Sequence, residues 1–94
     1  MKKRIPNKKS KTYVETLTPF IGSNLKSILM NRLYVVYSYN WYPIIIYDFS
    51  NEKWIKNITK YSPSTSRHLT ECTPNRIIFE QLEFEKIKQL YPNV

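Results

Sequence analysis

The 94-residue chain holds one glycine, one cysteine and one histidine, and it contains no alanine. A single glycine excludes the glycine-rich loops that cradle nucleotide phosphates, because those loops need several glycines at fixed spacing. A single cysteine, Cys72, cannot form a disulfide within the chain. Free cysteine is typical of reducing compartments, so we expect a cytoplasmic location.

Long apolar runs are also missing. The longest run, Trp41 to Tyr47, is seven residues long and is interrupted by Pro43. A membrane-spanning helix needs roughly 20 apolar residues, so we expect no membrane partner.

The scarcity of histidine and cysteine limits the chemistry of the chain. His68 and Cys72 are four residues apart and would share one face of a helix. Two ligands are too few for a zinc site, and no further histidine or cysteine exists to complete one. The sequence has no recognisable nucleophile turn for a Ser-His-Asp triad. We therefore expect no metal, no cofactor and no enzymatic activity, and we leave the roles of His68 and Cys72 open.

Positive charge is abundant but unevenly placed. Residues 12–94 carry nine Lys or Arg against seven Asp or Glu, a net charge of +2 out of the +8 of the whole chain. The other six positive charges lie at the N-terminus, on Lys2, Lys3, Arg4, Lys8, Lys9 and Lys11. This pattern predicts a disordered basic arm over residues 1–12 and a single small domain over residues 13–94. The arm is a candidate for binding nucleic-acid phosphates; a solubilising tail or a contact with an acidic protein is the alternative.

Three segments rich in Tyr, Val, Ile and Trp predict β-strands, at Leu33–Tyr39, Ile44–Tyr47 and Lys53–Asn57. The turn between the first two holds Asn40, the best candidate for a left-handed backbone where glycine is missing. Pro43, which has no N–H, is expected at a strand start.

The remaining segments predict helices and one further extended segment. Helical spacing predicts a helix from Ser23 to about Asn31. A second helix should begin at Ser62 or Ser64 and end before Pro74. Residues 76–80 should be extended or a fourth strand, and residues 82–91 should form a last helix that buries Leu82, Phe84, Ile87 and Leu90. The expected fold is α+β, a small antiparallel three- to four-stranded sheet with flanking short helices.

The block from Tyr34 to His68 resembles a family of very short bacteriophage proteins of unknown function. The shared pattern is a Tyr-Val-Val-x-Ser-Tyr strand, a Pro-Ile strand, an aromatic third strand and a Lys-Tyr-Ser segment followed by a Ser/Thr-rich helix start. The matching residues are Tyr34, Val35, Val36, Ser38, Tyr39, Pro43, Ile44, Trp54, Lys60, Tyr61, Ser62, Thr65, Ser66, Arg67 and His68. The resemblance implies a phage or mobile-element origin and implies no reaction.

This chain departs from the family pattern in three places. Asn40-Trp41-Tyr42 enlarges the first turn, and Ser64 replaces a common Thr. After His68 the chain continues with Glu71, Cys72 and Pro74 rather than with a basic helix. A role for a basic helix face cannot be carried over to this segment.

Two small groups of residues are functional candidates within this block. Ser64, Thr65, Ser66 and Arg67 lie at a predicted helix start, where free N–H groups favour an anion. Their alternative is structural, with the hydroxyls capping the helix and His68 packing under the sheet. Trp41 and Tyr42 lie in a predicted turn, where exposed aromatics favour a protein or base partner.

The sequence thus predicts a small phage or mobile-element accessory protein, located in the host cytoplasm or in the virion. The favoured function is non-specific binding of the nucleic-acid backbone, through the basic arm with help from Arg67 and its neighbouring hydroxyls. The alternative is a protein-binding module, either an inhibitor of a host factor or a small virion component, that uses exposed aromatics.

Overall fold

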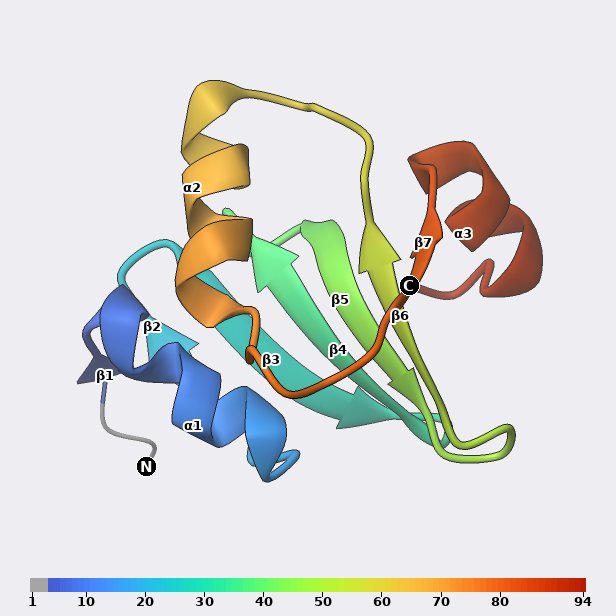
Figure 1. Ribbon diagram of the computed structural model, residues 1–94, viewed down its shortest axis with the longest axis horizontal. Helices are drawn as coiled ribbons and strands as arrows, with labels where there is room; N and C mark the ends of the chain where they lie inside the picture. The colour runs from blue at the N-terminus through green and yellow to red at the C-terminus, as the bar shows by residue number, and fades with distance from the viewer. Residues whose placement is uncertain (1–3) are drawn as a thin grey trace.

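The computed structural model describes residues 4–94, which form one seven-stranded mixed sheet and three α-helices (Figure 1). The strands occur in the sheet in chain order: β1 (Arg4–Ile5), β2 (Ile21–Gly22), β3 (Leu25–Met30), β4 (Leu33–Ser38), β5 (Tyr42–Asp48), β6 (Lys53–Asn57) and β7 (Glu80–Leu82). The helices are the 3-10 helix η1 (Asn7–Lys9), α1 (Ser10–Glu15), α2 (Pro63–Cys72) and α3 (Phe84–Leu90).

Strand β4 lies at the centre of the sheet, and all six of its residues are buried. Such a strand needs cover on both faces, which explains why its sequence does not alternate between apolar and polar residues. Tyr34 and Val36 pack on one face, and Leu33 and Val35 pack on the other. The core therefore consists of two apolar layers, one on each side of the sheet.

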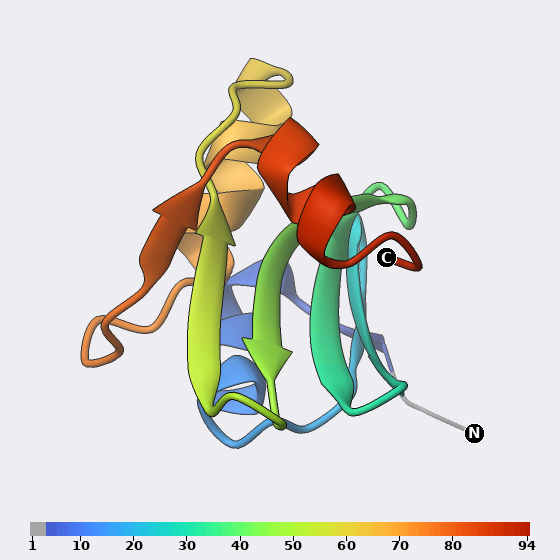
Figure 2. The same ribbon diagram turned by 90° about the vertical axis from the view of Figure 1, so that its right-hand side faces the viewer.

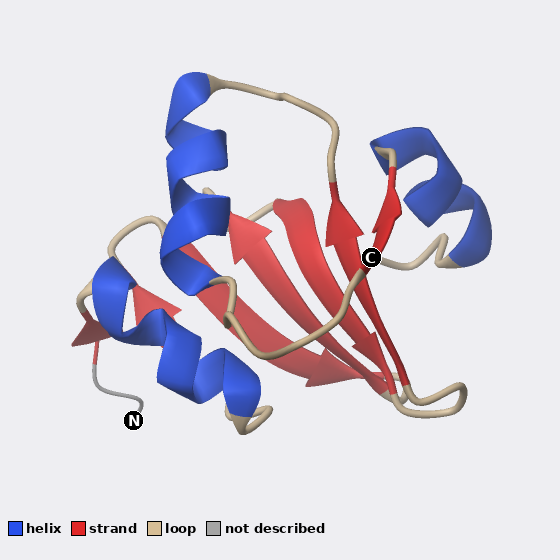
Figure 3. Cartoon of the chain, in the orientation of Figure 1, coloured by secondary structure: helices blue, strands red, loops and turns tan. Residues whose placement is uncertain are grey.

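Helices α1 and α2 cover one face of the sheet and α3 covers the other (Figures 1 and 2). On the first face, Val14 of α1 and Cys72 of α2 complete a buried cluster. On the second face, Ile87 of α3 is the buried helical residue. The loop from α2 to β7 runs across the α1/α2 face, where Phe79 packs at the margin of the first cluster (Figure 3).

Both ends of the sheet are parallel pairs, whereas every pair from β2 to β6 is antiparallel. β1 is joined to β2 through η1 and α1, and β6 is joined to β7 through α2. Parallel neighbours need a long crossover connection, usually a helix, so these two crossovers place α1 and α2 on the sheet.

The prediction of a three- to four-stranded antiparallel sheet was wrong, since the sheet has seven strands and parallel pairs at its ends. The predicted helix at residues 23–31 is strand β3, paired with β4 along its whole length from Leu25↔Ser38 to Met30↔Leu33. Asn31 and Arg32 both have positive φ, 46° and 62°, as a two-residue hairpin turn requires. Long-range pairing here overrides the helical spacing of the apolar residues.

The prediction of a disordered arm was wrong for residues 4–12. Arg4 and Ile5 pair in parallel with Ile21 and Gly22, and residues 7–15 are helical. Helices η1 and α1 both contact α2, so this segment is a part of the folded domain. Lys2 and Lys3 lie outside the described residues.

The C-terminal elements differ from their predictions at the ends. β7 begins at Glu80 and pairs in parallel with β6, later in the chain than the predicted extended segment. In α3, Ile87 is buried but Leu90 is half exposed. Tyr91 rather than Leu90 packs against the second core layer, and its hydroxyl donates to Asp48 Oδ2 at 2.8 Å.

Other local predictions are confirmed. β4, β5 and β6 occupy the three predicted strand segments, with shifts of one or two residues at some ends. Asn40 has a φ of 68°. Pro43 is the second residue of β5 and lies beside an irregularity in the β4–β5 register. Ser62 is the N-cap of α2, since its side chain accepts a hydrogen bond from the Thr65 N–H at 3.1 Å.

The packing of Gly22 gives a test of the N-terminal fold. A Cβ at this position would lie 2.8 Å from Asn7 Oδ1 and 3.2 Å from the Leu25 carbonyl oxygen. We expect Gly22→Ala to lower the free energy of unfolding by about 1 to 3 kcal/mol, because overpacking must displace η1 or β2. Urea denaturation measures this change. Ser23→Ala, at the exposed neighbouring position, is the control and should stay within about 0.5 kcal/mol of wild type. Equal stability of the Gly22→Ala protein would contradict the described packing of η1 on β2.

Candidate functional site

A buried polar network joins β4 to α2. Ser38 Oγ is hydrogen-bonded to His68 Nδ1 at 2.8 Å and to Thr65 Oγ1 at 3.2 Å. Ser62 Oγ donates to Thr65 Oγ1 at 3.1 Å and extends the network to the N-cap of α2. All three of Ser38, Thr65 and His68 are buried, and Tyr39 lies edge-on to the His68 ring. The network fixes the position of α2 on the sheet.

This network is structural rather than catalytic in its geometry. A serine next to a histidine resembles a nucleophile and its base, but Ser38 is fully buried and no substrate can reach its oxygen. Burial lowers the pKa of His68; the nearby Glu71 raises it and Arg67 lowers it further. His68 is therefore neutral at pH 7, as a hydrogen-bonded core imidazole should be.

Cys72 is equally shielded. Its side chain is fully buried, and burial raises the pKa of the thiol to about 12. The thiolate is the reactive form of cysteine, so this group is chemically quiet at neutral pH. Within residues 4–94, no group of three or more His, Cys, Asp or Glu side chains is placed to hold a metal ion.

The predicted cluster at the start of α2 is divided by the helix. Successive residues of an α-helix point about 100° apart, so four neighbours cannot share one face. Thr65 points into the network. Ser66 points toward a cavity beside the helix, while Ser64 and Arg67 are exposed on the flank turned away from that cavity. The four residues therefore do not form one anion site.

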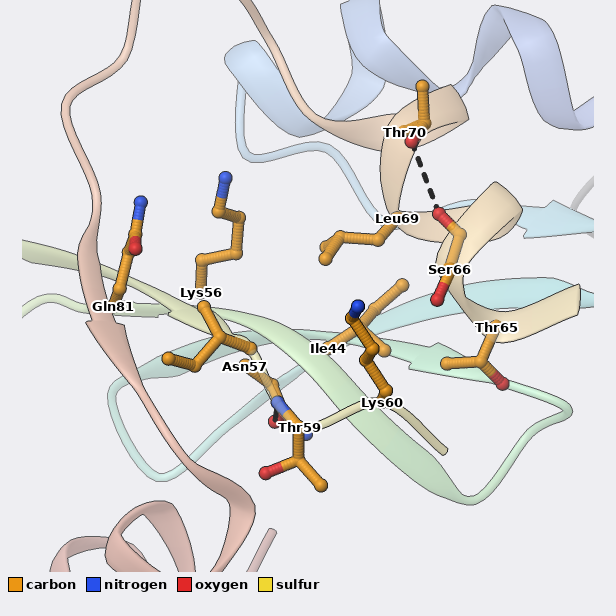
Figure 4. A pocket seen from close by; sticks show the side chains of 11 residues that line it. Ile44, Lys56, Asn57, Thr59, Lys60, Thr65, Ser66, Leu69, Thr70 and Gln81 are labelled. Carbon is orange, nitrogen blue, oxygen red and sulfur yellow. Dashed lines mark hydrogen bonds between the residues drawn. The ribbon is translucent and has the colours of Figure 1, made fainter. Parts of the chain in front are cut away.

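The cavity lies between α2, β6 and β7 and has a volume of about 320 Å³ (Figure 4). Ile44 and Leu69 form its apolar part. Lys56, Lys60 and Gln81 rise beside them from the sheet side, as Figure 4 shows. No acidic side chain lines it. Sequence reasoning missed this site because Lys56 and Lys60 meet Ser66 of α2 and Gln81 of β7 only through the β6–α2–β7 crossover.

The N-terminal cations lie at the opposite edge of the sheet, around β1, η1 and α1 (Figure 1). Arg4, Lys8 and Lys9 are exposed, and Lys11 is half-buried. Among residues 4–94 the one ion pair is Lys53 Nζ with Glu80 Oε1 at 3.0 Å, so none of these four cations is neutralised by a salt bridge there.

An aromatic cluster gathers at the end of the sheet where β4 ends and β5 begins. Trp41 contacts Tyr61 with ring centroids 5.3 Å apart, and Tyr61 stacks on Tyr42 at 4.6 Å. Phe84 at the start of α3 also stacks with Tyr42, with ring centroids 5.0 Å apart. Trp41 and Tyr61 are 53% and 51% exposed, whereas Tyr42 is only 3% exposed.

Tyr42 therefore differs from its sequence-based placement in an exposed turn. It is the first residue of β5, and its ring belongs to the core. The exposed ring beside Trp41 is Tyr61. Tyr61 belongs to the Lys60-Tyr61-Ser62 segment of the family pattern, but no sequence signal predicted that its ring is exposed.

No protein-family model, curated protein or solved structure matches the chain. No helix in the described part of the chain has the length and apolar character needed to cross a membrane.

The state of His68 gives a pH prediction. Its pKa is lower in the folded protein than the ordinary value of 6.5, so the unfolded chain binds a proton first as the pH falls. The contribution of His68 to the free energy of unfolding should be constant above about pH 7 and should decrease between pH 7 and 5.5. His68 is the only histidine, so His68→Gln should remove most of this decrease. Urea titrations of both proteins at pH 7.5 and 5.5 measure it, and an equal decrease in the two proteins would contradict a neutral buried His68.

Proposed function

We propose that this chain is a non-enzymatic accessory protein of a bacteriophage or mobile element that binds the phosphate backbone of nucleic acid. The binding surface, here called the N-terminal cationic surface, consists of Arg4, Lys8, Lys9 and Lys11. Arg67 adds a further cation on α2. The protein would act in the host cytoplasm or within the virion.

The observation that carries this proposal is the fixed position of unpaired cations on a folded surface. The pairing of Arg4 and Ile5 with β2 and the packing of η1 on α2 hold these side chains to the domain. No acidic residue occurs between Arg4 and Val14 to oppose them. A fixed array of cations loses less conformational entropy on binding than a disordered arm does, so it supports binding to a regular duplex.

Salt dependence tests the proposal. Each phosphate contact contributes about −0.9 to the slope of log K against log salt for duplex DNA. The triple variant R4Q/K8Q/K9Q should therefore bind duplex DNA with a slope less negative by about 2 to 3. Fluorescence anisotropy with a labelled duplex at several salt concentrations measures both slopes.

The matched control is R32Q/R76Q/K86Q, which removes the same net charge at exposed positions outside the N-terminal cationic surface. We expect its slope to stay close to that of the wild-type protein. A triple variant with the wild-type slope, together with a control that loses binding, would overturn the assignment of this surface. We use substitutions rather than an N-terminal truncation because removal of residues 1–12 would delete β1 and η1 from the fold.

A second candidate function, binding of a protein partner, is favoured by the contact between Trp41 and Tyr61. Both rings are half exposed, and exposed Trp and Tyr commonly anchor protein interfaces. Such a partner would be a host factor or a virion protein.

Affinity capture from a nuclease-treated bacterial lysate tests this second candidate. A specific partner should be retained by the wild-type protein and lost by W41S/Y61S, because both ring anchors are removed. F49S removes an aromatic of 40% exposure in another turn and should keep the partner. Equal retention by all three proteins would exclude the Trp41–Tyr61 surface as the interface.

A further inference from the structure

The cavity between α2, β6 and β7 has the charge of an anion site. Its lining includes Lys56 and Lys60 and no Asp or Glu. Neither ammonium group has a salt-bridge or hydrogen-bond partner among residues 4–94; Lys56 lies 5.7 Å from the ring centroid of Phe79. Two cations beside one cavity favour a ligand with two negative charges, such as a phosphate monoester near neutral pH.

The other polar groups of the lining differ in their availability. Thr59 Oγ1 accepts from the Phe84 N–H at 2.7 Å, and Thr70 Oγ1 donates to the Ser66 carbonyl at 3.2 Å, so these hydroxyls have partners. The side chains of Ser66 and Gln81 have no hydrogen-bond partner within the described chain and remain able to bind a ligand. They add neutral donors to the two lysines.

The walls of the cavity are held in place by buried contacts. Asn57 Nδ2 donates to the Pro43 carbonyl at 2.8 Å, and the Thr59 N–H donates to Asn57 Oδ1 at 2.9 Å. On the opposite wall, Thr65 is fixed by its hydrogen bonds to Ser38 and Ser62. A cavity held by such contacts is formed before a ligand arrives, which favours binding.

The apolar part of the cavity favours an organic group on the ligand. Ile44 and Leu69 offer no hydrogen bonds, so inorganic phosphate alone would leave this part uncovered. The volume of about 320 Å³ is at the small end of ligand pockets, which span roughly 300 to 1,000 Å³.

We propose that this cavity binds a phosphate monoester of mononucleotide size, either a free nucleotide or the 5′-phosphorylated end of a strand. Lys56, Lys60 and Ser66 hold the phosphate, and Ile44 and Leu69 contact the apolar part of the ligand. The site is separate from the N-terminal cationic surface, which lies at the other edge of the sheet. The proposal therefore does not depend on duplex binding.

Isothermal titration calorimetry of the full chain with adenosine 5′-monophosphate tests the proposal, with adenosine and inorganic phosphate as reference ligands. We expect the nucleotide to bind at least about tenfold more tightly than either reference ligand. Adenosine lacks the phosphate group, and inorganic phosphate lacks the organic group that would contact the apolar part of the cavity. K56Q/K60Q should weaken nucleotide binding by about tenfold or more. R76Q/K86Q, which removes two cations outside the cavity, should bind as the wild-type protein does.

Substitutions at Thr70 provide a second test that keeps both lysines. Thr70 lines the cavity from the exposed side of α2. T70E places a negative charge there and should weaken binding, while T70Q has a similar size and should retain it. Equal binding by T70E and T70Q, unchanged binding by K56Q/K60Q, or equal binding of adenosine and its monophosphate would each overturn the proposal.

Short single-stranded oligonucleotides with and without a 5′-phosphate distinguish the two sources of the ligand. Tighter binding of the phosphorylated strand than of the unphosphorylated strand indicates a strand end, whereas equal binding of the two strands, with the free nucleotide still bound, indicates a free nucleotide. R4Q/K8Q/K9Q should keep its affinity for the nucleotide. This result separates failure of the cavity proposal from failure of the duplex-binding proposal.

Discussion

Burial of the central strands on both faces determines where the helices of this fold must lie. β4 has no exposed residue, so the sheet must be covered on each side by a separate layer. The chain satisfies this need with α1 and α2 on one face and α3 on the other. Ser38, the polar residue at the end of β4, is accommodated because Thr65 and His68 of α2 satisfy its hydroxyl.

The same arrangement separates the two cationic regions of the molecule. α2 contacts η1 and α1, which carry Lys8, Lys9 and Lys11 of the N-terminal cationic surface. The flank of α2 with Ser66 and Thr70 lines the cavity together with Lys56 and Lys60. The formal charge of +8 is therefore not spread evenly over the surface. The two regions differ in chemistry: one is an open array of cations suited to a polyanion, and the other is a hollow with apolar walls suited to a small ligand.

Local structure could be predicted from the sequence where local signals agree with the fold. Tyr34, Val35 and Val36 indicate a strand in any context, and Ser62 followed by Pro63 indicates a helix start. The parallel edge strands could not be predicted, because β1 and β7 have two and three residues and depend on helical crossovers. β3 was predicted as a helix because Leu25, Ile28 and Leu29 fit a helical period. Pairing with β4 makes this segment a strand, and that long-range pairing is not visible in the local sequence. The cavity could not be predicted either, because Lys56 and Ser66 meet across that crossover.

We propose that the two cationic regions, at opposite edges of the sheet, bind different forms of phosphate. Mapping of backbone amide shifts by NMR, with duplex DNA and adenosine 5′-monophosphate added in separate titrations, tests it most directly. We expect the duplex to shift the amides of residues 4–11 and the nucleotide to shift the amides around Lys56, Lys60 and Ser66. Nucleotide-induced shifts confined to residues 4–11, or the same set of shifts with both ligands, would contradict it.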